Sequence, residues 1–217
     1  VNRDLPRSTR PPDQAAAPRL DGQYRFAHPE PPRSAIRVWP VFLPFAGCRT
    51  RCVYCDQNTQ TGQETVRLDA VLAGLDRDLA SALARRASRS DASLGTLDLG
   101  FYGGTFTGIP WPWVERFLTV ARRYQDLGLL GQVRCSTRPD ALTPDLSRRL
   151  REHGLGMVEL GVQSFDDAAL ATSGRGYDGR TAMAACEMVL DAGLDLGIQL
   201  MPGLPGAGPG VFVKDIA

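Results

Sequence analysis

Gly47-Cys48-Arg49-Thr50-Arg51-Cys52-Val53-Tyr54-Cys55 is the most informative stretch of this chain, because it holds three of the five cysteines within eight positions. The stretch follows an apolar run, Ile36–Phe45, that reads as a β-strand with an exit marked by Pro44. We therefore expect the three cysteines on a loop just after a strand. Clustered cysteines in such a place indicate metal or redox chemistry more often than packing.

Two other interpretations of the three cysteines fit less well. A core stripe on a helix suits the spacing of four and three, but Thr50 and Val53 are mediocre helix formers. A structural zinc site needs four ligands, usually in two pairs. The other candidates form no second pair; they are His28, Cys135, His153 and Cys186. Cys135 and Cys186 are expected to be structural. Three local thiolates instead suit an iron–sulfur cubane with one iron open to another ligand.

Strand and helix patterns alternate along the chain, which predicts a parallel sheet built from βαβ units. The expected strands are Ile36–Phe45, Thr96–Tyr102, Val133–Ser136, Gly156–Val162 and Leu194–Leu200. The expected helices are Val66–Ala87, Trp113–Leu127, Thr143–His153, Phe165–Thr172 and Thr181–Ala192, with another opening at Val211–Ala217. Each candidate motif falls at the end of a strand, where parallel α/β folds build their chemistry.

Three further motifs follow strands. Gly103-Gly104-Thr105 allows backbone to approach a ligand closely. The run Val158–Phe165 carries Glu159 and Gln163 among apolar residues, and these need polar partners, either each other, the loop backbone or a ligand. Gln199 precedes the turn Pro202–Gly206, and Arg138 lies in the turn after the third strand.

Together these motifs resemble the radical S-adenosylmethionine (SAM) superfamily, whose cysteine signature has the spacing of Cys48, Cys52 and Cys55. The resemblance implies a partial (βα)6 TIM-like barrel with a [4Fe–4S] cluster on these cysteines. It also implies that SAM binds the open iron and is cleaved reductively to a 5′-deoxyadenosyl radical. By the same resemblance, the residues that hold SAM are Tyr54, Gly103, Gly104, Thr105, Gln163, Arg175 and Gln199. Thr105 departs from the family pattern, which has an acidic residue there.

The resemblance is strongest to the Elongator catalytic-subunit and oxygen-independent coproporphyrinogen III oxidase branches. Ser136-Thr137-Arg138-Pro139-Asp140 is similar to the Elongator stretch, whereas Val158–Ser164 and Met201–Gly206 suit both branches. The implied substrate is tRNA or a small molecule such as a porphyrin precursor. The implied electron donor is flavodoxin or ferredoxin. A non-catalytic iron–sulfur and SAM-binding module remains the alternative.

Composition agrees with an ordinary globular domain. The 217 residues carry a formal net charge of +1, which gives no support for a dominant nucleic-acid-binding surface. Residues 1–35 are rich in Pro and Arg and are expected to be a disordered tail, with the core spanning residues 36–217. No apolar stretch approaches the ~20 residues that span a bilayer. We expect no membrane association, a cytoplasmic location and a barrel truncated after its fifth strand.

Overall fold

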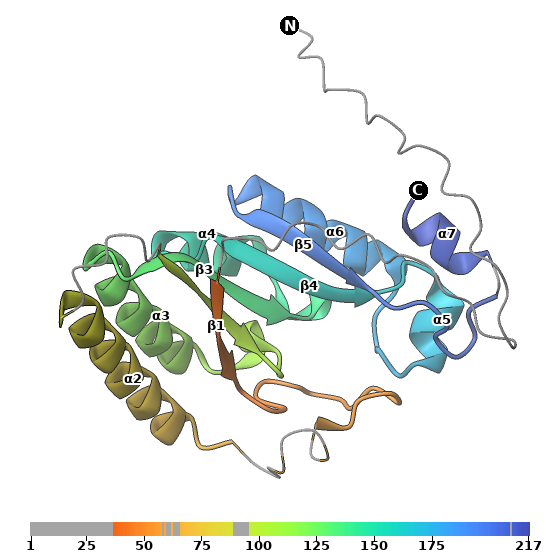
Figure 1. Ribbon diagram of the computed structural model, residues 1–217. Coiled ribbons are helices and arrows are strands. Elements are labelled where there is room, and N and C mark those ends of the chain that lie inside the picture. The colour runs from red at the N-terminus through yellow and green to blue at the C-terminus, as the bar shows by residue number, and fades with distance from the viewer. Residues whose placement is uncertain (1–36, 58, 60–61, 63–65, 89–95, 209) are drawn as a thin grey trace, which may run out of the picture. The chain divides into compact units, whose positions relative to one another are not determined.

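The computed structural model describes residues 37–57, 59, 62, 66–88, 96–208 and 210–217 (Figure 1). All of them belong to one compact unit, Ala35–Ala217. The expected tail, residues 1–35, lies outside the described residues.

Five strands form one parallel sheet in the order β1-β2-β3-β4-β5. They are β1 (Arg37–Phe42), β2 (Leu97–Tyr102), β3 (Leu130–Thr137), β4 (Met157–Gln163) and β5 (Asp195–Leu200). Each strand pairs with the next one along the chain, as in a barrel wound in one direction. The predicted partial TIM-like barrel of five strands is confirmed.

The long helices cover one face of this sheet, and the shorter ones follow the strand ends (Figure 1). The covering helices are α2 (Leu68–Ser88), α3 (Trp111–Asp126), α4 (Pro144–Glu152) and α6 (Gly179–Asp191). The shorter ones are α5 (Asp167–Thr172), α7 (Val211–Asp215) and the single 3-10 turns η1 (Phe106–Gly108) and η2 (Pro139–Ala141). Thr143 caps α4 as expected, because its hydroxyl accepts from the Leu146 N–H at 3.2 Å.

The helix-covered face of the sheet forms the apolar core. Successive residues of a strand point to opposite faces, so Leu99 and Phe101 of β2 share this face with Val133 and Cys135 of β3. All four are fully buried. Burial also raises the pKa of the Cys135 thiol, which agrees with its expected structural role.

The opposite face of the sheet is polar. Arg134 of β3 donates to Asp98 of β2 at 2.6 Å and to Glu159 of β4 at 3.4 Å. Ser136 also donates to Glu159, at 3.4 Å. The partners of Glu159 are therefore on β3, and the alternative that it bonds Gln163 is wrong. Among the described helices, none is long and apolar enough to cross a membrane.

Candidate functional site

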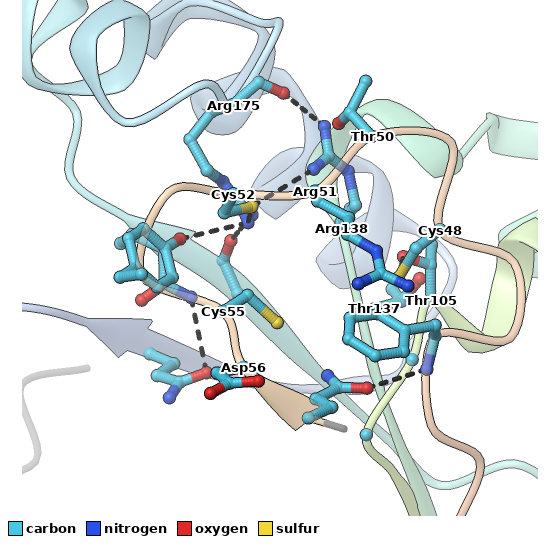
Figure 2. A pocket seen from close by; sticks show the side chains of 18 of the residues that line it. Cys48, Thr50, Arg51, Cys52, Cys55, Asp56, Thr105, Thr137, Arg138 and Arg175 are labelled. Carbon is cyan, nitrogen blue, oxygen red and sulfur yellow. Dashed lines mark hydrogen bonds between the residues drawn. The ribbon is translucent and has the colours of Figure 1, made fainter. Parts of the chain in front are cut away.

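A cavity of about 300 Å³ lies at the carboxyl ends of the strands. All ten residues predicted to bind a cofactor line it: Cys48, Cys52, Tyr54, Cys55, Gly103, Gly104, Thr105, Gln163, Arg175 and Gln199. Thr137 and Arg138 line it as well. Residues that are more than 120 positions apart in the chain, such as Cys52 and Arg175, therefore face one another here (Figure 2).

The loop that carries the three cysteines, residues 43–55, packs closely against the residues that follow β2. A Cβ on Gly47 would lie 2.2 Å from the Thr105 carbonyl oxygen, and Gly47 has a φ of +74°. A Cβ on Gly104 would lie 2.4 Å from the Ala46 carbonyl oxygen. Only glycine fits both positions. The sequence predicted that the backbone at Gly104 lies close to a ligand. In the structure, this backbone packs against Ala46, in the loop that carries the three cysteines.

The three cysteine thiols have different neighbours. Cys48 Sγ lies 3.2 Å from the Thr105 hydroxyl. Cys52 Sγ accepts from Arg175 Nη1 at 3.0 Å and from Arg138 Nη1 at 3.7 Å. Burial raises the pKa of the Cys55 thiol, and the nearby Cys52 and Cys48 raise it further. The thiols of Cys48 and Cys52 are thus close enough to act on the charge of Cys55.

Arg175 carries a buried charge, and the hydrogen-bond acceptors of its side chain are hydroxyls, a carbonyl and a thiol. Its side chain donates to the hydroxyls of Tyr54, at 3.2 Å, and of Tyr177, at 2.8 Å, and to the Gly161 carbonyl. None of the ion pairs found among the described residues includes it. Burial by itself lowers the pKa of Arg175, but Tyr177, Tyr54 and Cys52 outweigh that effect and raise it overall. A buried cation of this kind is stabilised by an anion, so the cavity favours an anionic ligand.

Gln163, in the cavity wall, combines an unusual backbone conformation with an unsatisfied side-chain oxygen. It ends β4 with a φ of 72°, which is unusual for a residue other than glycine. Its Nε2 donates to Gln199 Oε1 at 3.4 Å, while its buried Oε1 has no hydrogen-bond partner in the part of the chain that the structure describes. Strained backbone and an unsatisfied buried oxygen both mark ligand sites.

Comparison with known families decides what kind of site this is. The model of the Radical SAM superfamily matches residues 42–214, which is nearly all of the described chain. The chain belongs to the radical SAM superfamily. Members of this superfamily use a [4Fe–4S] cluster and SAM, and similar solved structures hold these groups.

Similar proteins include a member of the coproporphyrinogen oxidase branch that the motifs indicated. The heme chaperone HemW of Mycobacterium tuberculosis is 30% identical over 183 residues, covering 81% of this chain and 45% of the relative. An oxygen-independent coproporphyrinogen III oxidase of Bradyrhizobium diazoefficiens is 31% identical over 186 residues, covering 85% and 40%. The chain therefore spans less than half the length of these relatives.

Solved structures share the radical SAM fold at low sequence identity. Coproporphyrinogen III oxidase (HemN) from Escherichia coli has a TM-score of 0.60 and 19% identity, covering 83% of this chain and 40% of that one. The Elp3 protein of Methanocaldococcus infernus has a TM-score of 0.56 and 20% identity, covering 83% and 42%. These likenesses establish the fold of the described core.

The residues present suit the radical SAM cofactors. Within the described chain, no three His, Cys, Asp or Glu side chains converge closely enough to hold a single metal ion. In a cubane cluster, each thiolate bonds a different iron. Three cysteines spaced around a cavity, as Cys48, Cys52 and Cys55 are, therefore suit a [4Fe–4S] cluster. The buried Arg175 suits the carboxylate of SAM, and Gln163 Oε1 suits its amino group.

Two side chains of this radical SAM site were missed by the sequence reasoning as functional residues. Arg138 was interpreted only as a marker of the branch, yet it reaches Cys52. Tyr177 was not singled out, yet its hydroxyl lies between Arg175 and the carbonyls of Gly161 and Val162, 3.1 Å from each. The position of Arg138 directly after a strand was the one signal available for it.

Proposed function

We propose that this chain holds a [4Fe–4S] cluster on Cys48, Cys52 and Cys55, binds SAM beside it, and cleaves SAM reductively. When bound, the cluster and SAM supply an electron and a sulfonium bond whose cleavage yields a 5′-deoxyadenosyl radical for hydrogen abstraction. One observation supports the proposal most strongly. The three cysteines and the buried, charged Arg175 line the same cavity at the ends of the strands.

The other residues of the cavity then bind and orient SAM. Arg175 binds its carboxylate through the fork of the guanidinium, and Gln163 Oε1 accepts from its amino group. Tyr54 packs near the adenine, and its hydroxyl is already oriented by Arg175 at 3.2 Å. Gly103 and Thr105 border the amino-acid end of SAM, and Gln199 orients the Gln163 amide.

We further assign the radical SAM core to residues 36–217 and the protein to the cytoplasm. Such a core needs a one-electron donor, and a flavodoxin or ferredoxin has the required chemistry. Its substrate is tRNA or a small molecule. A tRNA uridine(34) acetyltransferase of Methanocaldococcus infernus is 35% identical over 71 residues, which supports the tRNA alternative.

Product analysis tests the proposal. Anaerobic reconstitution of the chain with iron and sulfide, followed by reduction in the presence of SAM, is expected to yield 5′-deoxyadenosine. Cys52→Ala is expected to abolish the product. Cys186→Ala is the matched control, because this buried cysteine lies on α6, outside the cavity lining. A reconstituted chain that holds no cluster, or equal product from Cys52→Ala, would contradict the proposal.

A second candidate is a cluster- and SAM-binding module that does not catalyse SAM cleavage but carries heme. Its support is the name heme chaperone, which relatives from several bacteria bear at 26–30% identity. This candidate predicts binding of cluster, SAM and heme without 5′-deoxyadenosine. Detection of that product at a rate that depends on Cys52 would reject it.

A further inference from the structure

Cys52 differs from the other two cysteines because two guanidinium groups approach its sulfur. Arg175 Nη1 lies 3.0 Å and Arg138 Nη1 lies 3.7 Å from Cys52 Sγ (Figure 2). The contact made by Cys48 is with the hydroxyl of Thr105. Among the described residues, the guanidinium hydrogen bonds to a cavity thiol are therefore made to Cys52, whereas Arg51, which also lines the cavity, acts on the charge of Cys55.

Arg138 is held in place by an ion pair with Asp140 and by a backbone carbonyl, apart from its contact with Cys52. Its Nε and Nη2 donate to the two carboxylate oxygens of Asp140 at 2.8 and 3.0 Å, which is a bidentate pair. Nη2 also donates to the Arg175 carbonyl, and the side chain is only 9% exposed. Nη1, the remaining nitrogen, is the one that faces Cys52. The ion pair with Asp140 thus fixes the direction in which this N–H points.

A fixed, buried N–H donor beside a thiolate changes the energetics of a bound cluster. One-electron reduction adds a negative charge to the cluster, spread partly onto its thiolates. A guanidinium near the sulfur stabilises the reduced cluster more than the oxidised cluster, because the reduced cluster carries more negative charge. Hydrogen bonds to sulfur and the local net charge are established determinants of iron–sulfur reduction potentials. Burial strengthens the effect, since solvent screens little of the charge.

We propose that Arg138 is a positioning residue that raises the reduction potential of the cluster by holding positive charge against Cys52, with Asp140 setting its orientation and moderating its charge. This inference rests on the proposed function, because it requires a cluster on Cys52. The electron comes from a one-electron donor of low potential, and the step transfers no proton.

The two members of the ion pair make opposite predictions. Arg138→Gln removes a positive charge near Cys52 and is expected to shift the midpoint potential to more negative values. Asp140→Asn removes the neighbouring negative charge and is expected to shift it to more positive values. If the pair served only to stabilise the turn after β3, both substitutions would loosen the same structure and shift the potential in the same direction.

The experiment is a potentiometric measurement of the reconstituted full chain, followed by electron paramagnetic resonance, with iron and sulfide content determined for each variant. Loss of one charge-assisted hydrogen bond is expected to change the reduction equilibrium by about tenfold, which is about 59 mV for a one-electron couple. Arg138→Lys, which keeps the charge without the bidentate geometry, is expected to shift less than Arg138→Gln. Arg148→Gln is the matched control, because its ion pair with Asp145 lies on the exposed surface of α4.

Each outcome decides the matter. Opposite shifts for Arg138→Gln and Asp140→Asn, with no shift for Arg148→Gln, support the inference. Unchanged potentials, or shifts of both variants in the same direction, overturn the inference about Arg138. The proposed function still holds in that case if the cluster is present and responds to SAM. If Arg138→Gln cannot be loaded, the sign of the Asp140→Asn shift decides alone. If the unchanged chain holds no cluster, the proposed function and this inference both fail.

Discussion

Two arginines of this chain, the partly buried Arg134 in the middle of the sheet and the buried Arg175 at the strand ends, have different kinds of partners. Arg134 lies between two carboxylates, with Asp98 at 2.6 Å and Glu159 at 3.4 Å. Arg175 is 5% exposed and meets hydroxyls, a carbonyl and the Cys52 thiol. The protein therefore supplies the counter-charge of Arg134 within its sheet, which makes Arg134 a structural arginine. Under the proposed function, the counter-charge of Arg175 comes from a ligand in the cavity.

The largest expected effect follows from removing the sulfur that faces Arg175. Cys52→Ala is expected to reduce iron and sulfide content after reconstitution to the background level, because a cubane held by two local thiolates loses a corner ligand. Iron and sulfide assays with an absorption spectrum measure this. Cys135→Ala and Cys186→Ala should load normally, and loading of Cys52→Ala at the level of these controls would show that Cys52 is not a ligand.

Replacing the structural arginine is expected to destabilise the chain. Arg134→Met leaves Asp98 and Glu159 without their cation, so the free energy of unfolding is expected to fall by about 3 kcal/mol. Denaturation in urea, without cofactors, measures it. The double variant with Asp98→Asn should recover part of the loss. A decrease of less than about 1 kcal/mol would mean that the pairing within the sheet contributes little.

Replacing the cavity arginine is expected to affect binding more than stability. Arg175→Met removes a buried cation that has no carboxylate partner among the described residues, so the unloaded chain should lose only about 1 kcal/mol or less. SAM affinity of the cluster-loaded chain should fall about thirtyfold, corresponding to about 2 kcal/mol for a charge-assisted bond. Equilibrium dialysis with labelled SAM measures this. Equal affinity in the variant and the unchanged chain would remove Arg175 from the site.

The smallest effect is expected at a residue remote from both arginines. Thr143→Ala removes the hydroxyl that accepts from the Leu146 N–H at the start of α4. The free energy of unfolding should fall by about 1 kcal/mol, with SAM affinity unchanged. Thr143→Ser, which keeps the hydroxyl, is the control. A change in SAM affinity would show that general destabilisation, rather than local charge, explains the effects at the cavity.

Periodicity predicted the order of the strands and helices, but some boundaries depended on tertiary contacts. β3 begins at Leu130 rather than at the expected Val133, because Gly131 and Gln132 extend the strand although neither favours it locally. They lie opposite Asp98 of β2, whose carboxylate accepts from the Gln132 N–H at 3.0 Å. A single sequence does not show such a partner.

The features of the candidate site also fall into those that the sequence could predict and those that depend on tertiary contacts. The cysteines were predictable because their spacing is local, and Arg175 and Gln163 because a family resemblance placed them. The contact of Arg138 with Cys52 joins residues 86 positions apart, and its direction depends on Asp140. The backbone strain at Gln163 is likewise a property of the folded chain, with a φ of 72°. Neither feature leaves a pattern in the sequence.

The central claim is that SAM completes a cluster held by Cys48, Cys52 and Cys55. Electron–nuclear double resonance of the reduced, reconstituted chain tests it most directly, with SAM isotopically labelled at its amino nitrogen. A hyperfine coupling between the labelled nitrogen and the cluster is expected in the unchanged chain, and a smaller population of the coupled species in Arg175→Met. A cluster signal that is identical with and without labelled SAM would show that SAM does not bind the cluster.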